Sequence, residues 1–360
     1  MIVVGADVHV RNSFLCVSDE AGRRLKTGRV GNTLGEVAAF MAEFEDDSIH
    51  VGLESTTNSR AVWLLWQEYG REAERDVTVD VLHARNLRII ADSVNKSDKV
   101  DANILAQLLC SGLSLPTSYM PDDDVFAVRE QLRARADLVR LRTMVKNRIH
   151  SVLHRRGILK PRGDVFTKLG RAWLAEIELD EAGRIILDRH MAVLDALQLH
   201  IRDATKNVRD LSRQERWEAS ATIAQSMPGV GLITSMTVLA ELGDLRRFHS
   251  RAAVANFAGL VPRQRSSNEK HWQGGITHRG SSHLRAVLVE AAWVSLSRVP
   301  RYGSQYERIK ERRGSQKAIV AVARRMLEDL FTMLTTNRSF RHDPSSDRSR
   351  RGPTASSVAG

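Results

Sequence analysis

Cysteine is scarce in this sequence, and its scarcity limits what can hold the fold together. Of 360 residues only Cys16 and Cys110 are cysteines, and neither stands in a CxxC pair. The sequence therefore excludes a disulfide framework and a zinc ribbon, and a reducing cytosol fits it best.

Long apolar runs are missing as well. No stretch approaches the roughly 18 apolar residues that a bilayer-spanning helix needs. The start of the chain reaches an acid at Asp7 without passing through a basic leader. We therefore expect no membrane partner and no signal peptide, and a protein that works in the cytoplasm.

Charge, by contrast, is abundant and unbalanced. The chain carries 54 Lys and Arg residues against 43 Asp and Glu residues, a formal net charge of +11. This excess points to a polyanionic partner, because lysine and arginine that bind phosphate release counterions. Net charge says nothing about the fold. It narrows the partner to nucleic acid or anionic lipid.

The first 115 residues alternate between strand and helix patterns. Three strand-like segments come first, and helical and strand-like segments then take turns. The expected strands are 2–8, 13–19, 24–30, 50–54 and 79–82, and the expected helices are 34–46, 58–70, 84–92 and 99–110. This order predicts an α/β unit, a mixed sheet flanked by helices.

A long basic helix follows a linker between Pro116 and Pro121. Apolar residues keep an a/d-like rhythm from Val125 to Val152, which predicts one half of a coiled-coil hairpin whose second helix covers 181–212. The faces between these apolar residues carry Arg129, Arg133, Arg135, Arg140, Arg142, Lys146, Arg148, Arg155 and Arg156. A solvated surface is the ordinary explanation of such a face. The arginine excess makes a nucleic-acid-binding face the alternative.

Four acids stand where strands end and where a helix begins. Asp7 and Glu54 close apolar strands, while Asp98 and Asp101 lie three residues apart at a helix start and share a face. One interpretation is helix capping together with exposed strand ends. The other is a metal site, because clustered carboxylates repel one another and divalent cations remove that repulsion. Two such ions can stabilise the attacking and the leaving oxygen of a phosphodiester.

A second basic region surrounds a serine pair. Residues 226–247 hold Pro-Gly-Val-Gly between two apolar helical segments, an arrangement similar to a helix-hairpin-helix that presents backbone N–H groups to phosphate. Ser266 and Ser267 follow in a polar segment that is expected to be a loop, where serine pairs are usually turn formers. The cations around them include Arg263, Arg265, Lys270 and Arg279. A serine among arginines can also attack phosphorus, if its proton is accepted and the charge is stabilised.

Several of these motifs occur in one order along the chain. They are GADVH at 5–9, LEST at 53–56, NKSDKVDANILAQLL at 95–109 and MPGVGLITSMTVLAELGDLRRF at 227–248. In this set and order the sequence closely resembles the insertion sequence 110 family of transposases. The resemblance covers roughly residues 2–112 and 220–295, with a helical connector between them.

The resemblance implies a RuvC-like, RNase H-type domain with an Asp-Glu-Asp-Asp site. That pattern falls on Asp7, Glu54, Asp98 and Asp101, which are expected to hold Mg²⁺, with Mn²⁺ as an alternative ion. Acting on DNA, such a site takes the element ends or a circle junction and a target as its substrates.

The resemblance also implies a nucleophilic serine in the C-terminal domain, after a Pro-Arg segment. It falls on Ser267 with Ser266 beside it, and Asn268 stands where the family usually has glycine, so the choice between the two serines stays open. Recombination through a covalent serine–DNA intermediate, guidance by a structured RNA encoded by the element, and assembly into dimers and tetramers are further implications. The setting would be the nucleoid of a bacterial cytoplasm.

These expectations divide the chain into four parts. They are a RuvC-like catalytic domain at 1–115, a helical connector at 122–215, a mainly α-helical C-terminal domain at 216–337 that holds the serine, and a disordered tail at 338–360. The leading hypothesis is a transposase. One rival is a RuvC-like nuclease in which metal-activated water alone cuts the strand, and it predicts no covalent protein–DNA adduct. The other rival is a non-catalytic nucleic-acid-binding protein, in which alanine at Asp7 or Asp101 leaves every activity intact.

Overall fold

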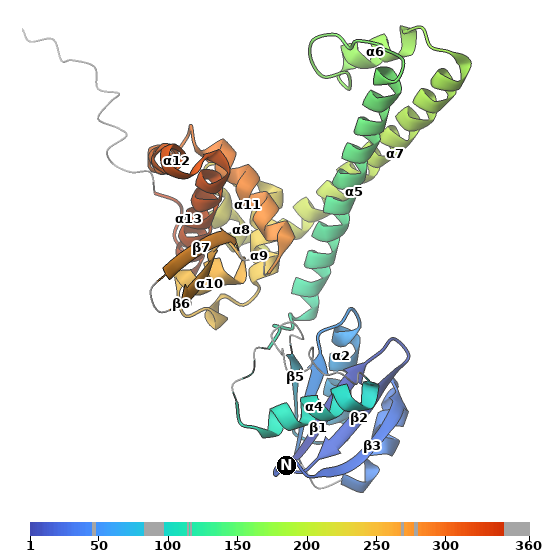
Figure 1. Ribbon diagram of the computed structural model, residues 1–360, viewed down its shortest axis with the longest axis vertical. Helices are drawn as coiled ribbons and strands as arrows, with labels where there is room; N and C mark the ends of the chain where they lie inside the picture. The colour runs from blue at the N-terminus through green and yellow to red at the C-terminus, as the bar shows by residue number, and fades with distance from the viewer. Residues whose placement is uncertain are drawn as a thin grey trace, which may run out of the picture. The chain divides into compact units, whose positions relative to one another are not determined.

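The chain folds into two compact units, Met1–Met120 and Pro121–Gly360. The computed structural model (Figure 1) describes residues 1–44, 48–82, 97–113, 115, 117–267, 270–276 and 280–341. Of residues 263–267 and 270–275 it describes the backbone alone. The helix expected at 84–92, and all of the expected tail beyond 341, lie outside the described residues.

A five-stranded sheet forms the centre of the first unit, in the order β3-β2-β1-β4-β5. Its strands are β1 (Ile2–Val8), β2 (Asn12–Ser18), β3 (Arg24–Gly31), β4 (Ile49–Glu54) and β5 (Val77–Leu82). The first three strands pair antiparallel, while β4 runs parallel to β1 and β5 parallel to β4. The mixed α/β unit predicted from the strand order is therefore confirmed.

Helices lie on both faces of this sheet (Figure 1). On one face, α1 (Leu34–Met41) and α2 (Ser59–Glu72) share an apolar core with alternate residues of β1. On the other, α4 (Asp98–Cys110) packs on β1 and β2. Because both faces of β1 are covered, all seven of its residues are buried, as a continuous apolar run predicts. The helix expected at 34–46 ends earlier, since Ala42–Phe44 forms a 3-10 turn.

Two 32-residue helices, α5 (Asp123–His154) and α7 (Glu181–Ser212), run side by side in the second unit. Each is preceded by an N-cap aspartate, Asp122 or Asp180, whose side chain accepts a backbone N–H, and α6 (Lys168–Glu176) lies in their connection. The buried residues Leu187, Leu194, Ile201 and Val208 recur every seven positions along α7. A seven-residue spacing keeps one apolar seam facing the neighbouring helix.

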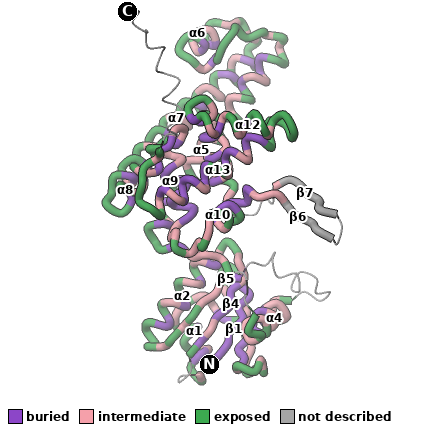
Figure 2. Tube along the Cα trace, turned by 90° about the vertical axis from the view of Figure 1, so that its left-hand side faces the viewer, coloured by how far each residue is buried: buried purple, intermediate pink, exposed green. Residues whose placement is uncertain are grey.

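The rest of the second unit is mainly helical. It contains α8 (Glu215–Gln225), α9 (Leu232–Leu242), a 3-10 turn (Leu245–Arg247), α10 (Arg251–Phe257), α11 (Ser282–Ser295), α12 (Pro300–Arg313) and α13 (Ser315–Thr335). Figure 2 shows α9 and α13 as largely buried, and both contribute to the core beneath the other helices.

The Pro-Gly-Val-Gly turn joins α8 to α9 and packs against α11. Gly229 has a φ of +91°, and a Cβ there would come 2.5 Å from the carbonyl oxygen of Ala291. Ser295 closes the contact by donating its hydroxyl to the carbonyl oxygen of Pro228 at 2.7 Å. Only glycine satisfies both the conformation and the close approach.

Candidate acidic site and basic surfaces

Asp7 lies on the face of β1 that α4 covers. Gly5, two residues earlier, lets the helix lie directly on the strand, because a Cβ there would come 2.0 Å from the carbonyl oxygen of Ala102. Strand side chains alternate between the two faces of a sheet, so Asp7 points to the same side as Gly5. Asp7 is only 7% exposed.

Asp98 and Asp101 both belong to the first turn of α4, at the helix start that the sequence predicted. The cap itself is Ser97, whose hydroxyl accepts from the backbone N–H of Val100. Neither aspartate is the N-cap residue, so the interpretation of the pair as side-chain caps is wrong. Their charge still suits the positive end of the helix dipole.

His9 completes a compact group with two of these acids. Its Nε2 lies 3.3 Å from Oδ2 of Asp7 and 3.4 Å from Oδ2 of Asp98. One ligand atom from each of the three residues lies within 4.8 Å of the others. Arg29 donates to the same oxygen of Asp98 at 2.8 Å. The sequence analysis did not predict His9, although its position two residues after Asp7 is a signal for it.

The backbone around His9 is held by three residues. Its carbonyl oxygen accepts from Nδ2 of Asn32 at 2.8 Å and from Nδ2 of Asn58 at 3.0 Å. Its own N–H donates to the carbonyl oxygen of Asn12 at 3.0 Å. The end of β1, the start of α2 and the end of β3 are thereby tied together beside the acids.

The electrostatics of this group leave negative charge unsatisfied. Burial raises the pKa of Asp7 above its ordinary value near 3.8, His9 opposes the shift, and Asp98 and Asp101 add to it. Oδ1 of Asp101 is buried and accepts no hydrogen bond within the described residues. Such an oxygen costs free energy unless a partner is supplied. Clustered carboxylate oxygens are the donors that a hard divalent cation prefers, so these residues fit one.

Glu54 ends β4, the strand beside β1. Gly52 on this strand pairs with Gly5, and a Cβ at Gly52 would come 2.7 Å from Cδ1 of Leu109 on α4. Glu54, two residues later, therefore points to the same face as α4, and it is half-buried. It is not part of the compact group around His9.

Ser266 and Ser267 lie on a strand of the second unit and not in the expected loop. The strand β6 (Pro262–Ser267) pairs antiparallel with β7 (Lys270–Ile276) to form a hairpin. The polar sequence lacks the apolar alternation by which a strand is recognised. The backbone alone is described for Ser266, Ser267, Arg263, Arg265 and Lys270, and Arg279 lies outside the described residues.

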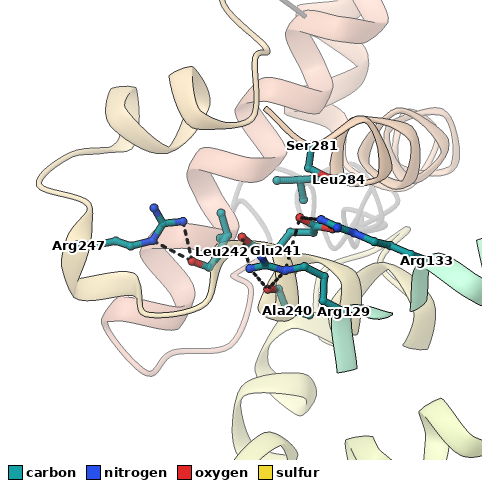
Figure 3. Close-up of polar contacts among 8 residues, drawn as sticks. All are labelled: Arg129, Arg133, Ala240, Glu241, Leu242, Arg247, Ser281 and Leu284. Atoms are coloured by element: carbon teal, nitrogen blue, oxygen red, sulfur yellow. Dashed lines mark hydrogen bonds and ion pairs between the residues drawn. The ribbon is translucent and has the colours of Figure 1, made fainter. Parts of the chain in front are cut away.

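Two arginines predicted to bind nucleic acid are engaged inside the second unit (Figure 3). Arg129 on α5 donates from Nη2 to the carbonyl oxygen of Ala240 at 2.8 Å, and its side chain is 13% exposed. Arg133 donates from Nη2 to both carboxylate oxygens of buried Glu241, at 3.0 and 3.2 Å. These contacts join α5 to the C-terminal end of α9 and give both arginines a structural role.

Arg247 closes the same end of α9 (Figure 3). Its Nε and Nη2 lie 3.1 and 3.0 Å from the carbonyl oxygen of Leu242. The guanidinium also lies 4.1 Å from the ring centre of Phe248 and 4.4 Å from that of Phe257. Cations near helix carbonyls satisfy acceptors that the helix cannot.

The remaining predicted cations of α5 and its end differ in their neighbours. Three of them form ion pairs: Arg140 with Asp137, Lys146 with Asp164 and Arg156 with Asp180. Arg148 and Arg155 are exposed, and neither has an acid within ion-pair distance in the part of the chain that the structure describes. These two are the cations most open to an external phosphate.

Two family models of transposases match separate parts of the chain. A DEDD transposase model of the IS110 type matches residues 4–156. A model described as the IS116/IS110/IS902 transposase family matches residues 221–307. Among the described residues, no helix has the length and apolar character needed to cross a membrane.

Individual relatives agree with the family models. The chain is 29% identical over 259 residues to the transposase for insertion sequence element IS1111A of Coxiella burnetii, covering 69% of each chain. It is 29% identical over 243 residues to the putative transposase y4qE of Sinorhizobium fredii, covering 67% of this chain and 58% of the relative. A pilin gene-inverting protein of Moraxella bovis is 31% identical over 123 residues, which are 33% of this chain and 38% of that protein.

Proposed function

We propose a mechanism for this protein, which belongs to the IS116/IS110/IS902 family of transposases and is therefore a DNA transposase. In the proposal, the carboxylates of Asp7, Glu54, Asp98 and Asp101 hold Mg²⁺, for which Mn²⁺ can substitute, and a serine of β6 is the nucleophile. The observation that carries it is that Asp7 lies beside Asp98 and Asp101, which come from a distant part of the chain, and that Oδ1 of Asp101 is buried without a hydrogen-bond partner among the described residues.

The first unit is proposed to be a RuvC-like, RNase H-type domain. Three antiparallel strands followed by two parallel ones, with α4 across one face, support this assignment. The face that carries α4 also carries the four acids, so one face of the sheet would hold the whole metal site. When bound there, a divalent cation would neutralise the carboxylates and polarise a phosphodiester oxygen.

The protein's own groups would prepare this site. His9 keeps Asp7 and Asp98 together through its Nε2, and Arg29 donates to the same Oδ2 of Asp98 that His9 contacts. Asp101 offers an oxygen that nothing else in the described chain satisfies. The site is thus arranged before a cation or DNA arrives, which limits the reorganisation required on binding.

The serine step is proposed as a transesterification. The hydroxyl oxygen of Ser267, or of Ser266 beside it, attacks a DNA phosphorus, and its proton passes to a base. A serine–phosphorus ester forms as the bond to a sugar oxygen breaks, and that oxygen leaves as a hydroxyl. Attack by the hydroxyl of another DNA end then releases the serine and rejoins the strand. Arginines of the hairpin would stabilise the charge at phosphorus.

The connector at 122–215 is proposed as a coiled coil that holds an element-encoded guide RNA. The seven-residue spacing along α7 supports the coiled coil, and the exposed Arg148 and Arg155 support a phosphate contact. The domain at 216–337 would follow, with the Pro-Gly-Val-Gly turn serving as part of a helix-hairpin-helix against DNA. The assembly is proposed to be a dimer or tetramer.

A metal-dependent nuclease without the serine step is the second candidate, and the acidic group alone favours it. Incubating the protein with a DNA circle junction and then denaturing it separates the two. A covalent protein–DNA adduct that Ser267→Ala or Ser266→Ala removes supports the transposase mechanism. Cutting without any adduct, in both serine variants, would leave the nuclease.

A second experiment asks whether one copy supplies both groups. Asp101→Ala protein is mixed with protein that lacks the nucleophilic serine, and strand exchange is measured in assemblies shown to contain both. We expect partial rescue, because an intact acidic site of one copy can then meet an intact serine of the other. No rescue in such assemblies would mean that acid and serine act within one chain.

A further inference from the structure

Two neighbouring cavities at the surface of the second unit are rich in arginine. The first, of about 690 Å³, lies between α12 and α13, and the second, of about 250 Å³, lies where α13 ends. Arg301 and Tyr302 line the first, and Arg301 lines both, so the cavities adjoin. The arginines that line the two cavities are Arg301, Arg308, Arg324, Arg325, Arg338 and Arg341.

The acids that face these arginines are too few to neutralise them. Asp329 accepts from Arg301 at 3.1 Å and lies 3.3 Å from Arg325, so it serves two cations. Glu328 accepts from Arg324 at 2.8 Å. These are the two acids that line the cavities.

The other three arginines have no such partner. Arg308, Arg338 and Arg341 are exposed, and none forms an ion pair within the described residues. Among the described residues, six arginines against two carboxylates leave a net positive charge of about four along the two adjoining cavities, a field that attracts polyanions.

The framework beneath the arginines is rigid. Buried Tyr302 donates its hydroxyl to Asp329 at 2.8 Å, and burial raises the pKa of that hydroxyl, so it remains a donor at neutral pH. The guanidinium of Arg301 lies 5.2 Å from the ring centre of Tyr302 and 4.8 Å from that of Phe340. Contact with two aromatic rings and the hydrogen bond to Asp329 hold the guanidinium plane of Arg301 in one orientation.

We infer that these cavities, named here the α12–α13 arginine groove, bind the phosphate backbone of duplex DNA. A protein partner would need exposed apolar anchors at the centre of the contact, whereas Tyr302 and Met333 are buried in the core beneath the groove. A DNA transposase must grip DNA outside the reacting phosphodiester, and contacts to backbone phosphates set its position without reading sequence. The groove is distinct from both the acidic group and the serine hairpin.

The test uses the full-length protein without divalent metal, so that its outcome does not depend on the proposed chemistry. Binding of a fluorescent DNA duplex of arbitrary sequence is measured by anisotropy across a salt series. In Arg308→Gln/Arg338→Gln/Arg341→Gln protein the slope of log K against log salt should become shallower by roughly 0.9 per lost contact. Affinity should fall equally for unrelated duplex sequences.

A matched control removes the same charge elsewhere in this unit. Arg251, Arg298 and Lys317 are exposed, do not line the groove, and form no ion pair within the described residues. Their triple substitution to Gln should leave the slope close to that of the unmodified protein. An equal loss in the control would mean that net charge, and not the groove, binds DNA.

Two further arms complete the test. Glu328→Gln should tighten duplex binding, because it removes a competing carboxylate and releases Arg324; unchanged or weaker binding would count against the groove. Binding of an RNA hairpin of equal length is measured in the same way, to decide whether the groove binds DNA or RNA. If the arginine variant loses RNA affinity and keeps its duplex DNA affinity and slope, the assignment to DNA is overturned.

Discussion

Two carboxylate sites of this protein differ in how far the chain itself satisfies their charge. Glu241 in α9 is 5% exposed at its side chain and accepts bidentate hydrogen bonds from Arg133, with Arg129 beside it. At Asp7, by contrast, burial raises the pKa of the carboxyl group. His9 lowers that pKa, and the neighbouring carboxylates of Asp98 and Asp101 raise it further. Asp101 there keeps an oxygen without a partner in the described chain.

We interpret the difference as one between charge with a structural role and, as proposed above, charge that a ligand would neutralise. A carboxylate that the chain satisfies itself holds two helices together and has little left to offer. Carboxylates that repel one another cost stability and are retained at functional sites, where a bound ion removes the cost. Substitutions at the acidic group around Asp7 and at Glu241 test the comparison, because the first should change DNA strand exchange and the second the stability of the second unit.

The largest expected effect is on DNA strand exchange. Asp101→Asn should lower its rate by about 10²–10³-fold or more, as removal of one electrostatic contributor to a transition state commonly does. The fold should persist, because the buried Oδ1 of Asp101 accepts no hydrogen bond among the described residues that the substitution could remove. Strand exchange on a circle-junction substrate gives the rate, and circular dichroism checks the fold. An active Asp101→Asn protein would remove Asp101 from the catalytic set.

Glu241→Ala should have the reverse effect of Asp101→Asn, because it should change stability and not the acidic site. It should lower the free energy of unfolding of the second unit by about 1–3 kcal/mol, because Arg133 loses its charged hydrogen-bond partner and Arg129 loses an ion pair at 3.9 Å. The loss is moderate because Arg133 is 39% exposed and can be hydrated. Urea denaturation measures it. Unchanged stability would show that the contacts of Glu241 with Arg133 and Arg129 do not stabilise the packing of α5 against α9.

A smaller effect is expected in the pH dependence of the first unit. Because the pKa of Asp7 is raised in the folded state, its ionisation lowers stability as pH rises through that pKa. Without metal, Asp7→Asn should therefore raise Tm at pH 7, by about 2–4 °C for each kcal/mol relieved. The advantage should shrink as pH falls toward 3.8, the ordinary value. Thermal scans from pH 4 to 8 test this, and a gain independent of pH would contradict it.

The smallest effect concerns the connector. Arg148→Gln/Arg155→Gln protein should show a salt slope for RNA binding that is shallower by roughly 0.7–0.9 per lost contact. Arg140→Gln/Arg156→Gln is the matched control, because both of those arginines already pair with acids. Equal slopes for the two variants would mean that Arg148 and Arg155 are solvated surface residues that do not bind RNA.

The sequence predicted elements whose pattern is local. The apolar run of β1 and the helical span 181–212 have nearly the bounds expected, because periodicity alone defines them. The hairpin of β6 and β7 was missed, since its polar residues carry no alternation. Arg129 and Arg148 look alike in sequence, and only the packing of α9 against α5 distinguishes them. The approach of His9 to Asp98 likewise depends on how α4 lies on the sheet.

The central claim is that the acids of the first unit are reserved for a divalent cation. Electron paramagnetic resonance of Mn²⁺ titrated into the full-length protein measures this binding without any DNA chemistry. We predict that the unmodified protein and Glu241→Gln bind Mn²⁺ alike, while Asp7→Asn and Asp101→Asn bind it at least about tenfold more weakly, a change of about 1.4 kcal/mol. Equal Mn²⁺ affinity in all four proteins would contradict the account.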